Sequence, residues 1–429
     1  MSTLNISSAR SAFPALTSNP TYVFADNAGG SQVAQPVIDR LTDYLINTNV
    51  QLGAGYAVSV ASTRRAVGEA TEGAKRLFGA RSADEVVFCA SATMGLENLA
   101  RGLEGDVCEG DEIVVTTEHE ANVGPWKKLA ARRGAVVKVW KASRMGDGGN
   151  PFALGLKVDE LLPLITKNTR LVAFTACSNI LGSVVPVKEV VAALRADARK
   201  KGARKVEVAV DCVAYSPHRL IDVQEWDVDF AGFSFYKVYG PHISALYVRS
   251  EALHASTKPL VHHFLKMDDT ASKLQPGGPG YELAYASTGA VEYLLTLTPF
   301  RDLRKTFDAI AEYEQSLLRP LLGFLCASEQ RERGVRVVGE EKVDLSRVPT
   351  VSFVVVGKKP IRSRDIVRVF DQKGGIGIRY GHFYAYSLVK ESLPDIDVDD
   401  GVVRISLVHY NTVEEVSRII EILKEILAQ

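Results

Sequence analysis

One lysine, Lys237, lies in a sequence environment that suits a chemical role for its amine. It is part of FSFYKVYGP (residues 233–241), where aromatic, small and turn-forming residues follow an apolar run. An amine that emerges from an apolar wall loses hydration, so its pKa falls and it becomes able to form a Schiff base with an aldehyde. The alternative is a lysine that extends its charge from the end of a strand into solvent.

A carboxylate precedes this lysine by 26 positions. The segment 205–213 alternates valines with polar and small residues and reaches Asp211, which predicts a strand with the carboxylate at its C-terminal end. Open α/β sheets bind ligands at that edge, although a lone Asp there is commonly a turn or N-cap residue. Together the two residues match the needs of pyridoxal 5'-phosphate, because a lysine holds its aldehyde and a carboxylate keeps its pyridine nitrogen protonated.

The elements that must position these residues follow an alternating pattern. Apolar, strand-like runs are separated by amphipathic stretches such as residues 187–201, which indicates parallel βαβ units covered by helices. The expected strands are residues 84–90, 112–117, 135–140, 170–176, 206–211 and 244–249.

The pattern changes after a Pro- and Gly-rich loop at residues 275–282. A last helix is expected to begin at Thr412, with Glu415 completing a capping box. We therefore expect an N-terminal segment (1–23) that packs with a small domain, a large cofactor-binding domain (24–294) and the small C-terminal domain (295–429). The strands expected in the small domain are residues 334–339, 350–356, 376–381 and 402–408.

Composition bounds the class of protein. The chain has 429 residues, 46% hydrophobic and 24% charged, which is enough for a large core and about two domains. A formal net charge of zero argues against a nucleic-acid binder or a polybasic membrane anchor, and no apolar run reaches the length of a membrane span. The start lacks a secretory signal, and the five cysteines show neither metal-ligand nor disulfide spacing, so a reducing, cytoplasmic setting is expected. These cysteines are Cys89, Cys108, Cys177, Cys212 and Cys326.

Several motifs, in order and at matching spacing, resemble one family over residues 24–429. The chain is similar to the class V aminotransferases among the fold-type I pyridoxal phosphate enzymes, and within them to the cysteine desulfurase-like branch. The resemblance implies an α/β fold with a large, mostly parallel seven-stranded sheet, a smaller α+β C-terminal domain, and a homodimer with the active site at the subunit interface. The motifs are FADNAGGSQ (24–32), FCASATMGLENLA (88–100), EHEANVGPW (118–126), SNILG (178–182), VDCV (210–213), the lysine segment and YNT (410–412).

The resemblance assigns the ring of the cofactor to a small set of residues. It implies that His119 stacks on the ring, that Asn179 donates to the phenolic oxygen, and that Asp211 faces the pyridine nitrogen. Tyr236, beside the lysine, is expected to contact the cofactor as well. A lone histidine would otherwise be a capping or solvated loop residue.

The phosphate is expected where a strand turns into a helix. Backbone amides and the Thr93 hydroxyl at a helix N-terminus suit an anion, although an ordinary N-cap explains the same residues. A further hydroxyl and residues of the partner subunit are implied to complete the site. The implied residues are Ser91, Ala92, Thr93 and Ser234, with Tyr285, Ser287 or Thr288 from the partner.

Substrate recognition points to arginine. Arg404 matches the residue that clamps an α-carboxylate, for which a bidentate guanidinium is suited, and Arg379 is a second candidate. Either residue could instead form a surface ion pair. Glycines in ADNAGG permit close backbone approach, so Ala28 and Gly29 are expected at the substrate, with Tyr56 shaping the pocket.

This chain departs from the family pattern at the residue that decides desulfuration. A cysteine desulfurase carries its nucleophile in the loop after an RxGH-like segment, but here RYGHFYAY (379–386) places Tyr384 at that position. A phenol cannot accept sulfur as a persulfide. Tyr236 and Ala214 also replace a histidine and a glutamine of the family, so we expect altered contacts around the cofactor.

The resemblance implies the first steps that these pyridoxal phosphate enzymes share, but leaves the product of the reaction open. An amino acid would replace Lys237 as an external aldimine, and the freed amine would remove the α-proton to give a quinonoid carbanion. Members of this branch in fungal specialised metabolism also lack the cysteine, so C–C bond formation or cyclisation of an alkaloid type is expected. Tyr384 and His382 would shape the pocket or shuttle protons. Epimerisation, transamination, C–S (or related β/γ-elimination) lysis of a cysteine-like substrate, and an inactive or regulatory homologue remain alternatives.

Overall fold

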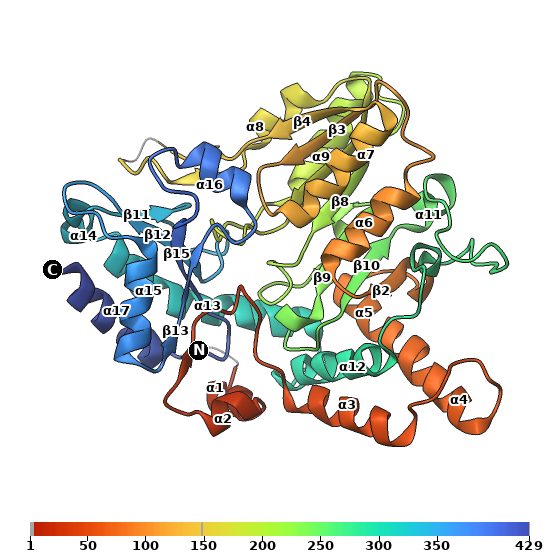
Figure 1. Ribbon diagram of the computed structural model, residues 1–429, viewed down its shortest axis with the longest axis horizontal. Helices are drawn as coiled ribbons and strands as arrows, with labels where there is room; N and C mark the ends of the chain where they lie inside the picture. The colour runs from red at the N-terminus through yellow and green to blue at the C-terminus, as the bar shows by residue number, and fades with distance from the viewer. Residues whose placement is uncertain (1–3, 147–148, 429) are drawn as a thin grey trace.

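The computed structural model describes residues 4–146 and 149–428. Residues 1–3 of the expected N-terminal segment and residue 429 of the expected small domain lie outside the described residues. Two sheets lie side by side, with the larger one at the upper right of Figure 1 and the smaller one at the left.

The large sheet has seven strands in the order β2-β10-β9-β8-β7-β3-β4. Neighbouring strands from β9 to β4 are parallel, and only β10 runs antiparallel to its two neighbours. The expected fold, with a mostly parallel seven-stranded sheet, is confirmed. The strands are β2 (Val86–Cys89), β3 (Glu112–Thr116), β4 (Val136–Trp140), β7 (Thr169–Thr175), β8 (Glu207–Asp211), β9 (Phe230–Ser234) and β10 (Ser244–Val248).

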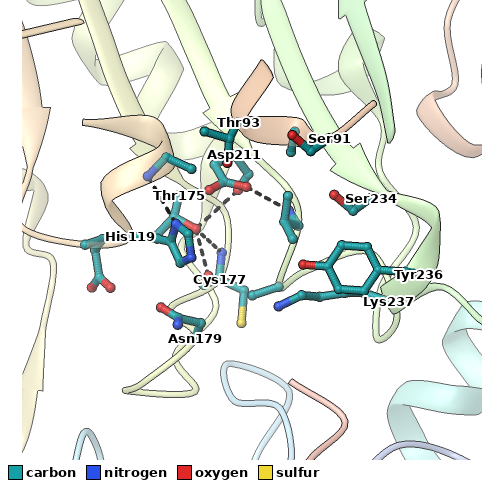
Figure 2. A pocket seen from close by; sticks show the side chains of 15 residues that line it. Ser91, Thr93, His119, Thr175, Cys177, Asn179, Asp211, Ser234, Tyr236 and Lys237 are labelled. Carbon is teal, nitrogen blue, oxygen red and sulfur yellow. Dashed lines mark hydrogen bonds between the residues drawn. The ribbon is translucent and has the colours of Figure 1, made fainter. Parts of the chain in front are cut away.

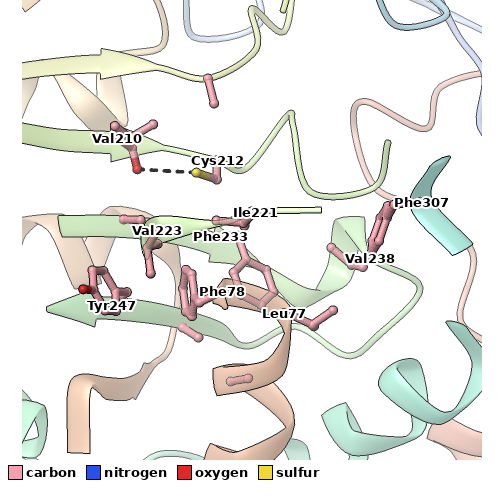
Figure 3. Packing of buried hydrophobic residues seen from close by; sticks show 14 of the residues in the cluster. Leu77, Phe78, Val210, Cys212, Ile221, Val223, Phe233, Val238, Tyr247 and Phe307 are labelled. Carbon is pink, nitrogen blue, oxygen red and sulfur yellow. Dashed lines mark hydrogen bonds between the residues drawn. The ribbon is translucent and has the colours of Figure 1, made fainter. Parts of the chain in front are cut away.

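Alternation along each strand divides the core between the two faces of this sheet. On β8, Val208 and Val210 belong to one hydrophobic cluster, whereas Ala209 belongs to another on the opposite face. On the first face, Figure 3 shows Phe78 packing near Phe233, with ring centroids 4.8 Å apart. The helices of that face include α5 (Ala70–Phe78), α9 (Val187–Lys200) and α12 (Tyr281–Thr296), and those of the other include α6 (Ala92–Gly102), α7 (Gly124–Arg133) and α11 (Ser250–Ala255).

The small sheet is antiparallel and has the order β11-β12-β15-β14. Helix α17 (Val413–Leu427) packs its apolar face on this sheet's cluster and begins with the expected capping box of Thr412 and Glu415. The expected strand at 376–381 is split, because β13 pairs with β1 while β14 pairs with β15. The elements are β11 (Val335–Val338), β12 (Thr350–Val355), β13 (Ile376–Gly377), β14 (Arg379–Gly381), β15 (Val402–Ser406), α14 (Ser328–Arg333), α15 (Ser363–Lys373) and α16 (Tyr386–Ser392).

One long helix, α13 (Leu303–Leu325), joins the two hydrophobic clusters. Its first residues, such as Phe307, belong to the cluster of the large sheet, and Leu317 and later residues belong to that of the small sheet. At the N-terminus, Phe13 packs against Tyr293 and Tyr410. The boundaries at residues 23 and 294 stay predictions.

The remaining described elements are helices and short strands that connect or flank the two larger sheets. Among the described helices, none is both long and apolar enough to cross a membrane. These elements are α1 (Ile6–Ser11), α2 (Pro14–Ser18), β1 (Val23–Phe24), α3 (Gln35–Asn47), α4 (Ala57–Thr63), η1 (Arg64–Glu69), η2 (Ala83–Glu85), η3 (Glu120–Asn122), β5 (Ser143–Arg144), β6 (Leu154–Gly155), α8 (Val158–Leu161), η4 (Leu162–Leu164), α10 (Val223–Trp226), η5 (Phe235–Lys237) and η6 (Ala271–Leu274).

Candidate active site

The C-terminal ends of the parallel strands bring the expected site residues into one cavity. Asp211 ends β8, Ser234 ends β9, and Lys237 follows β9 in the short helix η5. His119 and Asn179 lie just beyond β3 and β7 (Figure 2). These five residues line a cavity of about 70 Å³, which we call the inner cavity.

Lys237 is the buried amine that the sequence predicts. Only 7% of the residue is exposed, and its Nζ donates to the carbonyl of Ala28. Burial and, to a lesser extent, the nearby Arg404 guanidinium lower the pKa of Lys237 to about 8, while Asp211 acts in the opposite direction. Near neutral pH a minor fraction of this amine, about a tenth, is therefore uncharged and nucleophilic, far more than for an ordinary lysine.

Asp211 is a buried carboxylate with little to balance its charge. Its Oδ1 accepts one hydrogen bond, from the backbone N–H of Val213 at 2.9 Å. Burial raises the pKa of Asp211, and the hydrogen bond and the Lys237 ammonium offset only part of this effect. A cationic N–H placed beside this carboxylate would stabilise its charged form.

His119 is held as a neutral imidazole. Its Nδ1 accepts a hydrogen bond from the backbone N–H of Ala121 at 3.2 Å, so the proton of the neutral ring lies on Nε2. Burial lowers the pKa of His119 to about 4, helped by the positive charges of Lys237 and Arg404. The uncharged ring is thus available for stacking in the inner cavity.

Asn179 connects the inner cavity to the loop that follows β14. Its Nδ2 donates to the carbonyl of Phe383 at 3.0 Å, and its buried Oδ1 has no partner among the described residues. An amide nitrogen has two hydrogens, so one remains for a second acceptor. The predicted donation to a cofactor oxygen is compatible with this contact.

The N-terminus of α6 opens on the same cavity. Ser91 is the N-cap and accepts from Met94 N–H at 3.2 Å, and Ala92 and Thr93 are the first residues of the helix. The Ser234 hydroxyl, also at the cavity, lies 2.7 Å from that of Ser244. Free amides at a positive helix end, with nearby hydroxyls, form a suitable phosphate site.

Some residues expected at the site do not line the inner cavity, among them Ser287, Thr288 and Tyr56. Ser287 is buried in α12 and donates to Ala284 O at 2.7 Å, and Thr288 donates to Tyr285 O at 2.6 Å. Tyr56 is 51% exposed before α4. Contact with the cofactor of a partner subunit stays a prediction for Ser287 and Thr288, as does substrate contact for Tyr56.

A wider chamber of about 530 Å³, which we call the outer chamber, adjoins the inner cavity and shares Lys237, His119 and Asn179 with it. The predicted substrate residues Arg404 and Arg379 lie here. Other predicted residues that line this chamber are Ala28, Gly29, Thr93, Tyr236 and Tyr384.

The two arginines meet at one carboxylate that the sequence analysis did not single out, Asp26. Its Oδ1 is 3.0 Å from Arg404 Nη2, and its Oδ2 is 3.6 Å from Arg379 Nε. A Cβ added to Gly29 would lie 2.7 Å from Asp26 Oδ2, so a larger residue at this position would clash with that carboxylate. Burial lowers the pKa of Arg404 to about 10, with Asp26 opposing the shift.

Sequence reasoning also missed Glu118 and Phe383. Glu118 lines the inner cavity, and its Oε2 accepts from the Ser178 hydroxyl at 2.7 Å while Oε1 has no partner among the described residues. Burial raises the pKa of Glu118 to about 7. The motifs EHEAN and FADNAGG contain Glu118 and Asp26, so an acidic residue inside each motif was the available signal. For Phe383 the only signal was its place beside Tyr384.

The inner cavity fits pyridoxal phosphate on three structural grounds. It contains a buried lysine amine, a buried carboxylate with a single N–H partner, and a helix N-terminus flanked by hydroxyls. Sheet order and site together define a fold-type I pyridoxal phosphate enzyme.

Comparison with known proteins agrees with this class. The sequence model of the class V aminotransferases matches residues 23–419, so the chain belongs to the class V aminotransferase family, and its cofactor is pyridoxal 5'-phosphate. It is 42% identical to the aminotransferase-like protein FGM3 of Gibberella zeae over 99% of both chains.

Two further similarities extend the comparison. The chain is 33% identical, over 95% of its length, to 26% of the nonribosomal peptide synthetase-like enzyme fsqF of Aspergillus fumigatus. In fold it resembles the apo structure of a cysteine desulfurase from Thermococcus onnurineus, with a TM-score of 0.81, 24% identity and coverage of 98% of each chain.

Proposed function

We propose that this enzyme uses pyridoxal phosphate to act at the α-carbon of an amino acid and then forms a C–C bond or a ring, as in specialised, alkaloid-type metabolism. The observation that carries the proposal is the buried amine of Lys237, which shares one cavity with Asp211 and His119. An amine with a pKa near 8 serves both as a Schiff-base nucleophile and as a general base at neutral pH.

The residues of the inner cavity have separate proposed roles in holding the cofactor. Asp211 balances the charge of the ring nitrogen, His119 stacks on the ring as a neutral imidazole, and the N-terminus of α6 binds the phosphate. When bound, pyridoxal phosphate supplies an electron sink that stabilises negative charge at the substrate α-carbon.

Proton movement at the substrate is assigned to Lys237. Its Nζ takes the α-proton once the substrate amine has replaced it, and can return that proton from the same face. Arg404 orients the α-carboxylate, because its guanidinium lines the outer chamber next to Lys237. Tyr236 and Tyr384 border the same space and limit the entry of water.

A persulfide route is disfavoured by where the thiols lie. The described lining of the outer chamber contains Tyr384 and includes none of the five cysteines. Cys177 lines the inner cavity, but burial raises the pKa of its thiol to about 12. Sulfur transfer needs an accessible thiolate, and the described residues that line the two cavities offer none, which argues against a route through a protein persulfide.

Capture of the carbon nucleophile by a second reactant is supported by the space available. The outer chamber is several times larger than the inner cavity and opens directly beside Lys237. The name of one relative, a nonribosomal peptide synthetase-like enzyme, fits a setting in specialised metabolism.

The functional unit in this proposal is a homodimer with the active site at the subunit interface. Apolar side chains on α3, α4 and η1 support it, because Leu45, Ile46, Val60 and Val67 are each about half exposed or more. Exposed apolar surface of this kind marks a candidate contact between subunits.

Borohydride trapping tests the cofactor linkage. Reduction of the wild-type protein is expected to fix one cofactor on Lys237, detected by peptide mass spectrometry. Lys237→Ala should lose the label, whereas Lys128→Ala, which removes an exposed lysine of the outer chamber paired with Glu97, should keep it. A label elsewhere, or none, contradicts the proposal.

Product analysis in deuterated water separates the reaction classes. Deuterium at the α-carbon without elimination supports carbanion capture or epimerisation. A keto acid with ammonia, or alanine with sulfide from cysteine when a thiol reductant is present, identifies release of the leaving group instead. The Lys237→Ala variant should abolish exchange. Persistent exchange in that variant would remove Lys237 from the role of base.

A further inference from the structure

Two consecutive residues of the loop after β14 have backbone angles that side chains other than glycine rarely adopt. Phe383 has φ 48° and Tyr384 has φ 61°. Each carbonyl is tied to the wall of the site: that of Phe383 accepts from Asn179 Nδ2 at 3.0 Å, and that of Tyr384 accepts from Glu120 N–H at 2.8 Å. Such strain persists only where surrounding contacts fix it.

The fixed loop places the Phe383 ring on the guanidinium of Arg404. The Arg404 Cζ lies 3.7 Å from the ring centroid, whereas that of Arg379 lies 5.4 Å away. Both Phe383 and Arg404 are buried. The contact is therefore desolvated, a setting in which a cation is attracted strongly to an aromatic face.

The other contacts of Arg404 lie along its N–H groups. Nη2 donates to Asp26 at 3.0 Å and Nη1 to the carbonyl of Asn179 at 3.3 Å, whereas Nε has no partner among the described residues. A ring that covers the face of a guanidinium leaves hydrogen bonding to its N–H edge, where a substrate carboxylate must compete with Asp26 for Nη2. A carboxylate binds at that edge through parallel hydrogen bonds, so the orientation of the plane decides whether it can bind.

We propose that Phe383 is a positioning residue, whose ring sets the plane of the Arg404 guanidinium for the α-carboxylate of the substrate. The inference rests on the proposed function of Arg404 and names the residue on which that function depends. Phe383 also belongs to a hydrophobic cluster with Ile180 and Leu388, so a role in packing alone is the competing explanation.

The test compares Phe383→Leu with Phe383→Tyr in the cofactor-loaded protein. Probes are L-alanine and L-alaninamide, which differ in the carboxylate, and their dissociation constants are read from the cofactor absorbance. Loss of the ring is expected to weaken L-alanine binding about tenfold and leave L-alaninamide within twofold, while Phe383→Tyr keeps the wild-type preference. Phe152→Leu, which removes a buried ring of the same hydrophobic cluster that does not lie over Arg404, serves as the matched control and should keep the wild-type preference.

Opposite outcomes would overturn the inference. Equal weakening for both probes, with a lower melting temperature, assigns Phe383 to packing alone. A wild-type protein that binds the two probes equally well shows that no carboxylate reaches Arg404. Borohydride labelling of Lys237 in both the wild type and Phe383→Leu separates these results from failure of the proposed function. A wild type that carries no label would indicate that the proposed function itself is wrong.

Discussion

At the scale of single residues, burial favours the uncharged forms of the titratable groups at this site. The same desolvation lowers the pKa of Lys237 and of His119 and raises that of Glu118, because burial disfavours whichever form is charged. Lys237 thereby becomes a usable base, and His119 becomes a neutral ring. Glu118 has no role in the proposed chemistry, so burying its carboxylate should lower the free energy of unfolding.

Glu118→Gln tests this cost. The pKa of Glu118 rises from 4.5 to about 7 on folding, so between these pH values the folded chain binds the extra proton and the free energy of unfolding falls as pH rises. The variant, without cofactor, should exceed the wild type by less than about 1 kcal/mol near pH 5 and by up to about 3 kcal/mol at pH 8. Thermal unfolding at both pH values measures the difference.

The exposed Glu421 of α17 provides the control. Glu421→Gln should change the free energy of unfolding little at either pH. An equal shift of Glu118→Gln at pH 5 and pH 8 would show that the carboxyl does not titrate in this interval.

At the scale of elements, parallel strands place the chemistry and tightly packed helices hold the strands. Asp211 and Ser234 end neighbouring strands, β8 and β9, so the edge of the sheet brings them together. Below the sheet, α12 lies on α3 at very close range. A Cβ on Gly289 would lie 2.6 Å from backbone atoms of Pro36 and Val37.

Gly289→Ala is expected to force these helices apart. Because the neighbouring atoms are backbone, the free energy of unfolding should fall by about 1–3 kcal/mol, measured by urea unfolding. Gly323→Ala is the matched control, since its Cβ would meet nothing within 4 Å on the exposed side of α13. That variant should gain up to about 1 kcal/mol from helix propensity. Equal effects of both changes would refute the packing argument.

At the scale of the whole molecule, the unpaired apolar surface lies on the helices beside the large sheet. Ile46 on α3 is 74% exposed, the largest value among the large apolar side chains of the described chain. Helices α3 and α4 lie at the opposite end of the molecule from α17 (Figure 1). A substitution on α17 can therefore serve as a control for a substitution on α3 in a test of the proposed dimer.

Sedimentation velocity is expected to give a wild-type mass of twice the 46.7 kDa chain. Ile46→Asp should shift the equilibrium toward monomer, because a buried charge at an interface is costly. Val413→Asp, at the start of α17, changes an exposed valine to the same residue far from this surface and should stay dimeric. A monomeric wild type, or equal loss in both variants, would contradict the proposed dimer.

The sequence by itself determined the class of chemistry and most of the elements. Lys237 and Asp211 could be paired from their spacing, and the capping box of α17 and six strands of the large sheet follow from local patterns. Strand β9 was not recognised, because its run of apolar residues with a central glycine lacks the alternation that marks a strand.

Only the tertiary structure decided which distant side chains meet in the site. Asp26 reaches Arg404 across 378 positions, and Phe383 stacks on Arg404 through a loop whose backbone is left-handed without glycine. Local patterns specify helix or strand, whereas sheet order, loop strain and burial arise from the packing of the whole chain. Lys237 is identified by its neighbours in sequence, but its pKa near 8 is set by groups that folding brings around it.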